Sequence, residues 1–261
     1  MLKKMVFTLL LFGTMAFLNP LEILRDSIDV LNEMMGSPDA EAFAYLLKNA
    51  KGIAIFPSVY KVGLVFGVEY GEGFLLKRDE KTGEWFGPLF LKLAGGSWGY
   101  QVGIKSTSLL LVVMNEKGIE GFMKDNFTLG GDVSVSAGPL GRDISANVDY
   151  RLKASIYSYS LSKGFFLGLS LEGAYISIDE ENNFSYYKVP LTAEEILTTR
   201  IERKPELRKL IQLLEKLMRS FQTRKDNVSE QIIKAFPFSY QVRSVSIYQN
   251  FSRFQSGVVV V

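Results

Sequence analysis

The sequence contains neither cysteine nor histidine. The absence of cysteine excludes disulfides, thiolate nucleophiles and an acylated cysteine anchor, and it leaves oxidising and reducing compartments equally compatible with the chain. The absence of histidine removes the commonest general base and, with cysteine also missing, nearly all zinc and copper sites. The only kind of metal site still possible would be a hard cation bound by carboxylate oxygens. We therefore predict no metal site, no cofactor and no enzymatic activity.

The chain also lacks a strong excess of charge of either sign. Lys and Arg total 30 and Asp and Glu total 28, which gives a net charge of +2 over 261 residues. Proteins that bind nucleic acid usually carry a strong basic bias, so we expect no nucleic-acid partner. Any electrostatic function must come from a local patch. The hydrophobic share of 47% is ordinary for a globular protein with a sizeable core.

The most apolar run lies at the N-terminus and is shorter than the roughly 20 residues that a membrane-spanning helix needs. Lys3 and Lys4 precede this run, which extends from Met5 to Leu18, and Thr14 to Ala16 offers a small-residue cleavage signal. The pattern predicts a signal peptide over residues 1–19. It also predicts an exported protein, periplasmic or associated with the cell envelope. The alternative is an uncleaved segment at a membrane surface.

Two short helices are expected over residues 21–49, separated by a break at 36–39. From residue 53 to about 187 the pattern changes to short runs of β-forming residues punctuated by glycine. Strands are expected at 53–56, 62–66, 68–76, 97–104, 108–114, 133–137, 144–150, 155–160, 165–171 and 175–178, with a turn at 79–83 and one or two helical turns at 117–124. Such short, closely spaced strands indicate a mostly antiparallel sheet or a partly closed barrel.

After Pro190 the sequence becomes helical again. Thr192 and Glu195 have the spacing of a capping box, and apolar residues from 207 to 221 recur at helical spacing after Pro205. Basic residues outnumber acidic ones between residues 200 and 225. They form either a solvated helix face or a patch drawn to anionic membrane.

The overall prediction is an α+β fold in which a glycine-rich sheet is packed by N-terminal and C-terminal helices. One domain is expected over residues 20–190. A helical extension over 191–261 would follow it and end in a β-like tail at 238–261, which would pair at a sheet edge or dock in an apolar groove.

Two glycine clusters superficially suggest nucleotide-binding loops. Neither has the Lys-Ser/Thr pair of a phosphate-binding loop, and neither lies between a strand and a long helix. Gly63, Gly67 and Gly71 are four residues apart, as are the glycines at 95, 99 and 103. In a strand this spacing places glycines on one face, where we expect a helix or second sheet to approach closely.

Candidate binding residues occur in the alternating segment from 157 to 164. In a strand Ser158, Ser160 and Ser162 share one face beside Lys163, while the tyrosines share the other. Hydroxyl donors next to a cation would suit a phosphorylated head group. These serines are not candidate nucleophiles, because there is no histidine to act as base and no nucleophile-elbow motif.

A second candidate is Arg142, within a predicted turn at 138–143. Its planar guanidinium would clamp a phosphate or carboxylate. Alternatively it would pair with Asp132 or Asp143 and lock the loop.

Several blocks of the sequence, in the order in which they occur along the chain, resemble the SYLF (Ysc84-like) domain family, of the bacterial signal-bearing type. The resemblance covers roughly residues 21–188, and the matching blocks are 50–57, 61–67, 95–103, 129–143, 156–164 and 170–173. It implies a lipid-binding domain, associated in eukaryotic members with phosphoinositides, actin and membrane remodelling. Many members have a basic residue where this chain has Leu161. The cationic site would then rely on Lys61, Arg142 and Lys163.

We therefore expect a non-enzymatic module of the cell envelope that recognises anionic, phosphate-bearing lipid head groups. The expected lipid-binding residues are Lys61, Arg142, Ser158, Ser160, Ser162 and Lys163. The alternative is a structural or protein-interaction component of the envelope, which would dock a protein partner through the basic helix or the C-terminal tail.

Overall fold

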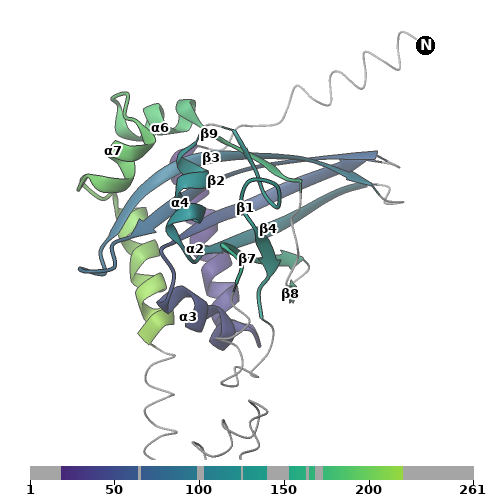
Figure 1. The fold of residues 1–261 in the computed structure, drawn as a ribbon, viewed down its shortest axis with the longest axis horizontal. Helices are drawn as coiled ribbons and strands as arrows, with labels where there is room; N and C mark the ends of the chain where they lie inside the picture. The colour runs from purple at the N-terminus through teal and green to yellow at the C-terminus, as the bar shows by residue number, and fades with distance from the viewer. Residues whose placement is uncertain are drawn as a thin grey trace, which may run out of the picture. The chain divides into compact units, whose positions relative to one another are not determined.

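The computed structural model describes residues 19–63, 66–98, 103–124, 126–139, 153–162, 165–167 and 173–219. These residues form an α+β fold in which helices cover both faces of a curled, mostly antiparallel sheet (Figure 1). The predicted fold class is confirmed.

The described strands form one nine-stranded sheet in the order β5-β9-β3-β2-β1-β4-β7-β6, with β8 paired to β7. The strands are β1 Gly52–Gly63, β2 Phe66–Arg78, β3 Trp85–Trp98, β4 Gly103–Val113, β5 Phe127–Thr128, β6 Val135–Ala137, β7 Ile156–Ser162, β8 Phe165–Leu167 and β9 Tyr175–Ile178. Only β6 and β7 pair in parallel among the named strands. The long strands β1–β4 extend past the helices at one end (Figure 1).

Strand β1 continues through Pro57, where the sequence predicted an end. Its pairing with β2 shifts register between Ile55 and Ser58, and its pairing with β4 shifts between Phe56 and Val59. Proline has no N–H for the ladder, and an irregularity in the pairing is where that loss is tolerated. The predicted strand 53–56 and residues 62–63 of the predicted strand 62–66 therefore belong to one longer strand, β1, whereas Phe66 is the first residue of β2.

The predicted single strand at 97–104 is wrong. Its described residues belong to two strands, since β3 ends at Trp98 and β4 begins at Gly103. The alternation of β-forming residues continues across the connection, so periodicity alone did not reveal it.

The alternating side chains of the strands form two hydrophobic cores, one on each face of the sheet. Ile53, Phe74, Leu110 and Tyr159 face the first core, which we call the helix core. Their strand neighbours, such as Leu109, face the second core. A sheet buried on both faces accounts for the nearly continuous apolar runs in β1 and β4.

Helices α2 (Pro20–Gly36) and α3 (Ala40–Lys48) cover the helix core, as the sequence predicted. Asn19 caps α2 through a complete capping box with Glu22, and Pro20 occupies the first helical turn. Phe43 from α3 packs edge-on against Tyr159 with ring centroids 5.4 Å apart. The capping box fixes the start of α2, and the ring contact holds α3 against β7.

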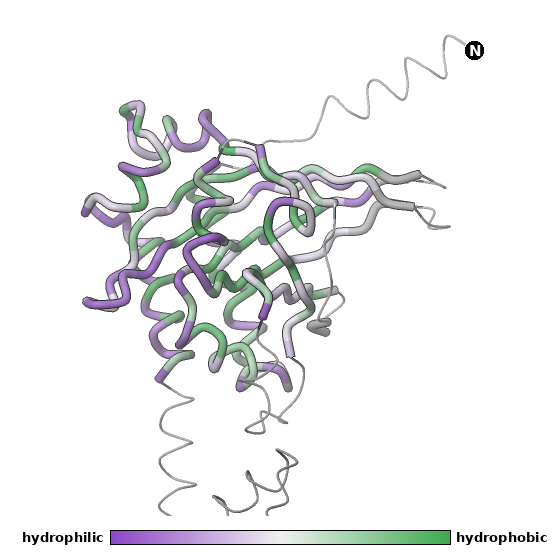
Figure 2. The backbone as a smooth tube through the Cα atoms, in the orientation of Figure 1, coloured by the Kyte–Doolittle hydropathy of each residue, from purple (hydrophilic) through white to green (hydrophobic). Residues whose placement is uncertain are grey.

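The helix of residues 205–219 also packs into the helix core. Its buried side chains are Leu207, Leu210, Ile211, Leu214 and Leu217. Hydrophobic and hydrophilic stretches alternate along it (Figure 2). The amphipathic helix predicted here is confirmed over the described residues.

The second core is covered by α4 (Glu116–Met123) and α7 (Ala193–Thr198). In Figure 1, α4 lies in front of the sheet and α2 behind it. The capping box of Thr192 and Glu195 begins α7 as predicted. Helix α6 (Glu180–Tyr187) was not predicted, because its sequence has no apolar stripe.

The predicted close approach of a helix or second sheet is not found at Gly71 or Gly95, the two glycines of these clusters whose surroundings are described. A Cβ atom at Gly71 would lie 2.9 Å from Val59 Cγ2, so the crowding comes from the neighbouring strand and not from a second layer. At Gly95 the nearest atom would be 3.7 Å away, and at Gly96 nothing lies within 4 Å. These two positions therefore have room for a side chain.

Some predictions lie outside the described residues: the strand at 144–150, the signal peptide up to residue 18, and the tail at 238–261. Among the described helices, none combines the length and apolar character needed to cross a membrane.

Candidate functional site

Residues 129–175 contain three of the blocks that resemble the SYLF family, and we call them the signature block. This block begins with a tight loop next to β9. Leu129 N donates to Ala174 O at 2.8 Å, and Gly130, with a φ of 85°, donates to Val133 O at 2.7 Å. The Asp132 carboxylate accepts from Thr128 N at 2.8 Å. Asp132 therefore stabilises its own loop. Its predicted alternative partner, Arg142, lies outside the described residues, as does Asp143.

The serine row on β7 lies inside the protein at the two positions whose side chains are described. Ser158 is 0% exposed and donates to Ser136 O at 3.3 Å. Ser160 is 2% exposed, and its Oγ has no hydrogen-bond partner in the described part of the chain. For Ser162 only the backbone is described, as the end of β7. Neither Ser158 nor Ser160 presents a surface hydroxyl.

The opposite face of β7 is aromatic, as predicted. Tyr159 is fully buried and donates its hydroxyl to Pro139 O at 2.9 Å. Burial raises the pKa of the Tyr159 hydroxyl well above its ordinary value. Strand β7 thus connects the signature block to the helix core.

Lys61 already has a partner across the sheet. Its ammonium lies 3.1 Å from Glu69 on β2, directly opposite in the strand register. Lys163 and Arg142 lie outside the described residues. Within the described part of the chain, the six predicted residues do not form a single exposed site. Their role in lipid binding stays a prediction.

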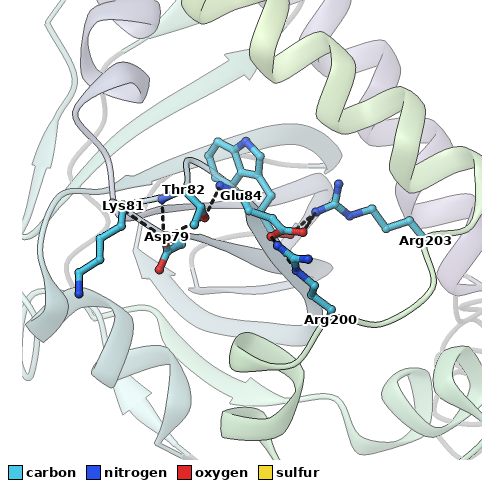
Figure 3. A network of polar contacts seen from close by, with 7 residues as sticks. Asp79, Lys81, Thr82, Glu84, Arg200 and Arg203 are labelled. Carbon is cyan, nitrogen blue, oxygen red and sulfur yellow. Dashed lines mark hydrogen bonds and ion pairs between the residues drawn. The ribbon is translucent and has the colours of Figure 1, made fainter.

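The basic residues before the C-terminal helix form a different kind of site, centred on Glu84 (Figure 3). Arg200 donates to Glu84 Oε2 through Nε at 2.9 Å, and its Nη2 lies 2.6 Å from the same oxygen in an ion pair. Arg203 donates to Trp85 O at 2.7 Å and lies 3.4 Å from the other Glu84 oxygen. Both guanidinium groups thus tie residues 200–203 to the start of β3.

The turn that precedes Glu84 is ordered by Asp79, also drawn in Figure 3. Its carboxylate accepts from Thr82 N at 2.7 Å, from the Thr82 hydroxyl at 2.8 Å and from Lys81 N at 3.0 Å. These bonds, the Thr82 amide first, hold the pKa of Asp79 below its ordinary value. The predicted turn at 79–83 is confirmed.

Two further charges in this part of the chain have internal partners. Lys204 donates to Tyr186 O at 3.1 Å and its ammonium lies 4.1 Å from the Tyr186 ring centroid. Burial raises the pKa of Tyr186 to about 12. Arg25 on α2 pairs with Glu206 at 2.8 Å and lowers the pKa of that carboxyl.

Helix 205–219 presents a cationic face to solvent. Its exposed positions are Pro205, Arg208, Lys209, Gln212, Lys216 and Arg219, with no acidic residue among them. The helical acids Glu206 and Glu215 lie at half-buried positions. Arg208 donates one N–H to Arg203 O at 2.8 Å, which holds its side chain near the helix start. We call Arg208, Lys209 and Lys216 the cationic face.

Sequence inspection predicted a basic segment but did not separate its two parts. The signal was available in the helical period, because the exposed basic positions follow the spacing opposite to the buried leucines. The partners of Arg200 and Arg203 are Glu84, just before β3, and Trp85, its first residue. They lie more than one hundred residues earlier, and no local pattern reveals them. Among the described residues, no three acidic side chains gather as a metal site.

The fold is that of an α+β protein with a curled, mostly antiparallel sheet between helical layers. Residues 94–217 match the Ysc84 family, described as "Las17-binding protein actin regulator". The resemblance to the Ysc84 (SYLF) domain family is confirmed at this level. The bacterial signal-bearing type stays a prediction.

Curated relatives extend this similarity over most of the chain. SH3 domain-containing YSC84-like protein 1 of Bos taurus is 32% identical over 202 residues, which cover 77% of this chain and 58% of that protein. Protein YSC84 of Saccharomyces cerevisiae is 36% identical over 199 residues, which cover 75% and 42% respectively. LAS seventeen-binding protein 3 of the same yeast is 37% identical over 185 residues, covering 70% and 39%. This chain thus matches about half the length of these relatives, and none of the three bears the name of an enzyme.

Proposed function

We propose that this protein is a non-enzymatic module that binds membranes bearing anionic, phosphate-containing lipid head groups. The observation that carries the proposal is the cationic face, where Arg208, Lys209 and Lys216 lie on the solvent side of a helix whose other side is fixed in the core. Anionic surfaces attract such residues by roughly 1 kcal/mol for each Lys or Arg.

Because one side of helix 205–219 is packed in the helix core, the helix would contact the membrane surface without inserting into it. Leu207, Leu210 and Leu214 are buried in the helix core, so the apolar side of the helix is not free to insert into acyl chains. Binding would then be mainly electrostatic and would weaken as salt screens it. Arg142 and Lys163 would add cations from the signature block, and Lys61 would contribute only if it exchanged Glu69 for a head group.

The cellular setting is part of the same proposal. The basic N-terminus followed by an apolar run supports export, with the mature protein in the periplasm or at the cell envelope. The membrane bound would then be one that faces this compartment.

A protein-binding function is the second candidate, and the relatives favour it. The matching family is described as Las17-binding, and the yeast relative LAS seventeen-binding protein 3 carries the same property in its name. For this chain the corresponding proposal is an interaction component that docks an envelope protein through the exposed side of helix 205–219 or through the tail at 238–261.

Vesicle co-sedimentation of residues 20–261 tests the lipid proposal. Vesicles of phosphatidylcholine alone would be compared with vesicles that also contain phosphatidylglycerol, cardiolipin or a phosphoinositide, each at low and high salt. We expect binding only to the anionic vesicles and a steep loss at high salt. Arg142→Ala and Lys163→Ala should weaken binding if the signature block takes part.

Two results would contradict the proposal. Equal binding to neutral and anionic vesicles would remove the head group from recognition. A protein that stays in the supernatant with every vesicle would leave protein binding as the function.

A further inference from the structure

A groove lies beside α6, and none of its lining residues belongs to the cationic face. It has a volume of about 780 Å³, within the roughly 300–1,000 Å³ of small-ligand pockets. Its apolar lining includes Met123, Ile178, Phe184 and Leu191, and its acidic lining consists of Glu180 and Glu181. The groove thus combines contributions from α4, β9, α6 and the segment before α7.

Two large apolar side chains at this place are exposed to solvent. Phe184, which lines the groove, is 55% exposed, and Val189, next to the lining residue Pro190, is 50% exposed. An exposed phenylalanine in a hollow has lost little of its hydration on folding and can still gain from burial against a ligand. This exposure points to an occupant with apolar side chains.

The walls of the groove are held by hydrogen bonds that do not involve its solvent side. Asp179 caps α6, accepts from Asn182 and forms an ion pair with Lys92 at 3.1 Å. Asn183 accepts from Phe90 N at 2.9 Å and donates to Phe90 O at 3.0 Å, which fixes α6 on β3.

The next wall is fixed independently. Tyr187 donates to Pro88 O at 2.9 Å, and the capping box of Thr192 and Glu195 sets the start of α7. A groove with such preformed walls loses little conformational entropy when a ligand binds.

The charge of the groove selects the occupant. Glu180 and Glu181 are both exposed in the first turn of α6, and both line the groove. Among the described residues that line it there is no lysine or arginine. A ligand with apolar side chains and neighbouring positive charges would fill the hollow and neutralise the two carboxylates.

We propose that this groove binds a short segment of a partner protein in which apolar residues alternate with Lys or Arg. The side chain of Phe184 contacts an apolar residue of the segment, while Glu180 and Glu181 pair with its cations. The inference does not rest on lipid binding, because its residues and charge are different from those of the cationic face.

Fluorescence anisotropy with two labelled decapeptide pools tests this inference. In the first pool Leu or Phe alternates with Lys or Arg, and in the second Asp or Glu replaces each basic residue. The full chain should bind the basic pool and not the acidic pool. Phe184→Ala should weaken binding by about tenfold or more, the usual effect of removing a central aromatic contact. The double variant Glu180→Lys with Glu181→Lys should abolish it.

Matched variants separate this site from general effects. Val68→Ala removes a side chain that is 62% exposed on β2, and Asp29→Lys with Glu33→Lys makes the same charge change on the exposed face of α2. Both should leave peptide binding unchanged, as should Arg208→Gln with Lys209→Gln. Equal binding of the two pools, no binding of the basic pool, or full binding by Phe184→Ala would overturn the inference. This assay contains no vesicles, so its result does not depend on whether the protein binds lipid.

Discussion

Residues 200–204 and the helix of residues 205–219 are both rich in basic residues, but their charges go to different places. Arg200 and Arg203 pair with Glu84, and Lys204 contacts Tyr186. On the helix, Lys209 and Lys216 instead occupy the exposed face opposite the buried leucines. The first group stabilises the fold, and the second is available to an anionic partner. The two groups have a similar basic composition, and only the tertiary structure shows which of them has partners within the fold.

The largest effect is expected from the buried side of the helix. Leu210→Ala leaves a cavity in the helix core, where this residue is fully buried. It should lower the free energy of unfolding by roughly 2–5 kcal/mol. Lys209→Ala, the matched change on the exposed side, should alter it by less than about 0.5 kcal/mol. Urea denaturation measures both, and similar losses for the two variants would show that this helix is not packed as described.

A smaller loss is expected when the internal pairs are broken. Glu84→Ala leaves Arg200 and Arg203 without their carboxylate and should cost about 1 kcal/mol, because this site is only partly shielded from water. Arg203→Ala should act similarly and also loses the bond to Trp85 O. A Glu84 variant as stable as the parent protein in urea would place residues 200–203 with the exposed group.

The buried hydroxyl of Tyr186 gives a pH-dependent prediction. Burial raises the pKa of Tyr186 to about 12. The unfolded chain loses this proton near its ordinary pKa, about 10, while the folded protein keeps it, so stability is present at neutral pH and falls as the pH rises from about 10 to 12. Absorbance titration should show a late tyrosine component that is missing in Tyr186→Phe. If the two titration curves coincide, Tyr186 is not buried as described.

The smallest effect is expected on the acidic face of α2. Burial, followed by the charges of Asp29 and Glu22, raises the pKa of Asp26. A raised carboxyl pKa favours folding at low pH, and this contribution is lost as the pH rises through it. At pH 7 the charged Asp26 is therefore unfavourable, and Asp26→Asn should stabilise the protein by roughly 0.3 kcal/mol after allowance for solvent screening. The gain should disappear in acid, and a loss of stability at pH 7 would contradict the assignment.

Local patterns predicted much of the fold. The apolar stripes of α2 and α3, the capping box before α7 and the strand at 175–178 all appear where the sequence placed them. Each of these signals lies within one element. Helix α6 has no such stripe. Its Asn183 bonds to the backbone of Phe90 on β3, and these two residues are far apart in sequence. Its position could not be predicted from local periodicity.

The candidate site was harder to predict than the fold for the same reason. Alternation correctly placed Ser158 and Ser160 on the face opposite Tyr159, but the sequence gave no sign that this face is covered. The strand that contacts Ser158 is β6, some twenty residues earlier. Lys61 likewise has a partner, Glu69, that only the strand register supplies. Which polar residues are exposed depends on these pairings.

One measurement tests the division between the two basic groups most directly. Arg208→Gln with Lys209→Gln and Arg200→Gln with Arg203→Gln remove the same charge from adjacent stretches of the chain. Their binding to phosphatidylglycerol vesicles at low salt should differ. The first pair should lose roughly 2 kcal/mol of binding free energy, or about 30-fold in affinity, while the second should keep most of its binding despite lower stability. Equal losses would mean that only net charge matters and would contradict a cationic face built on the helix.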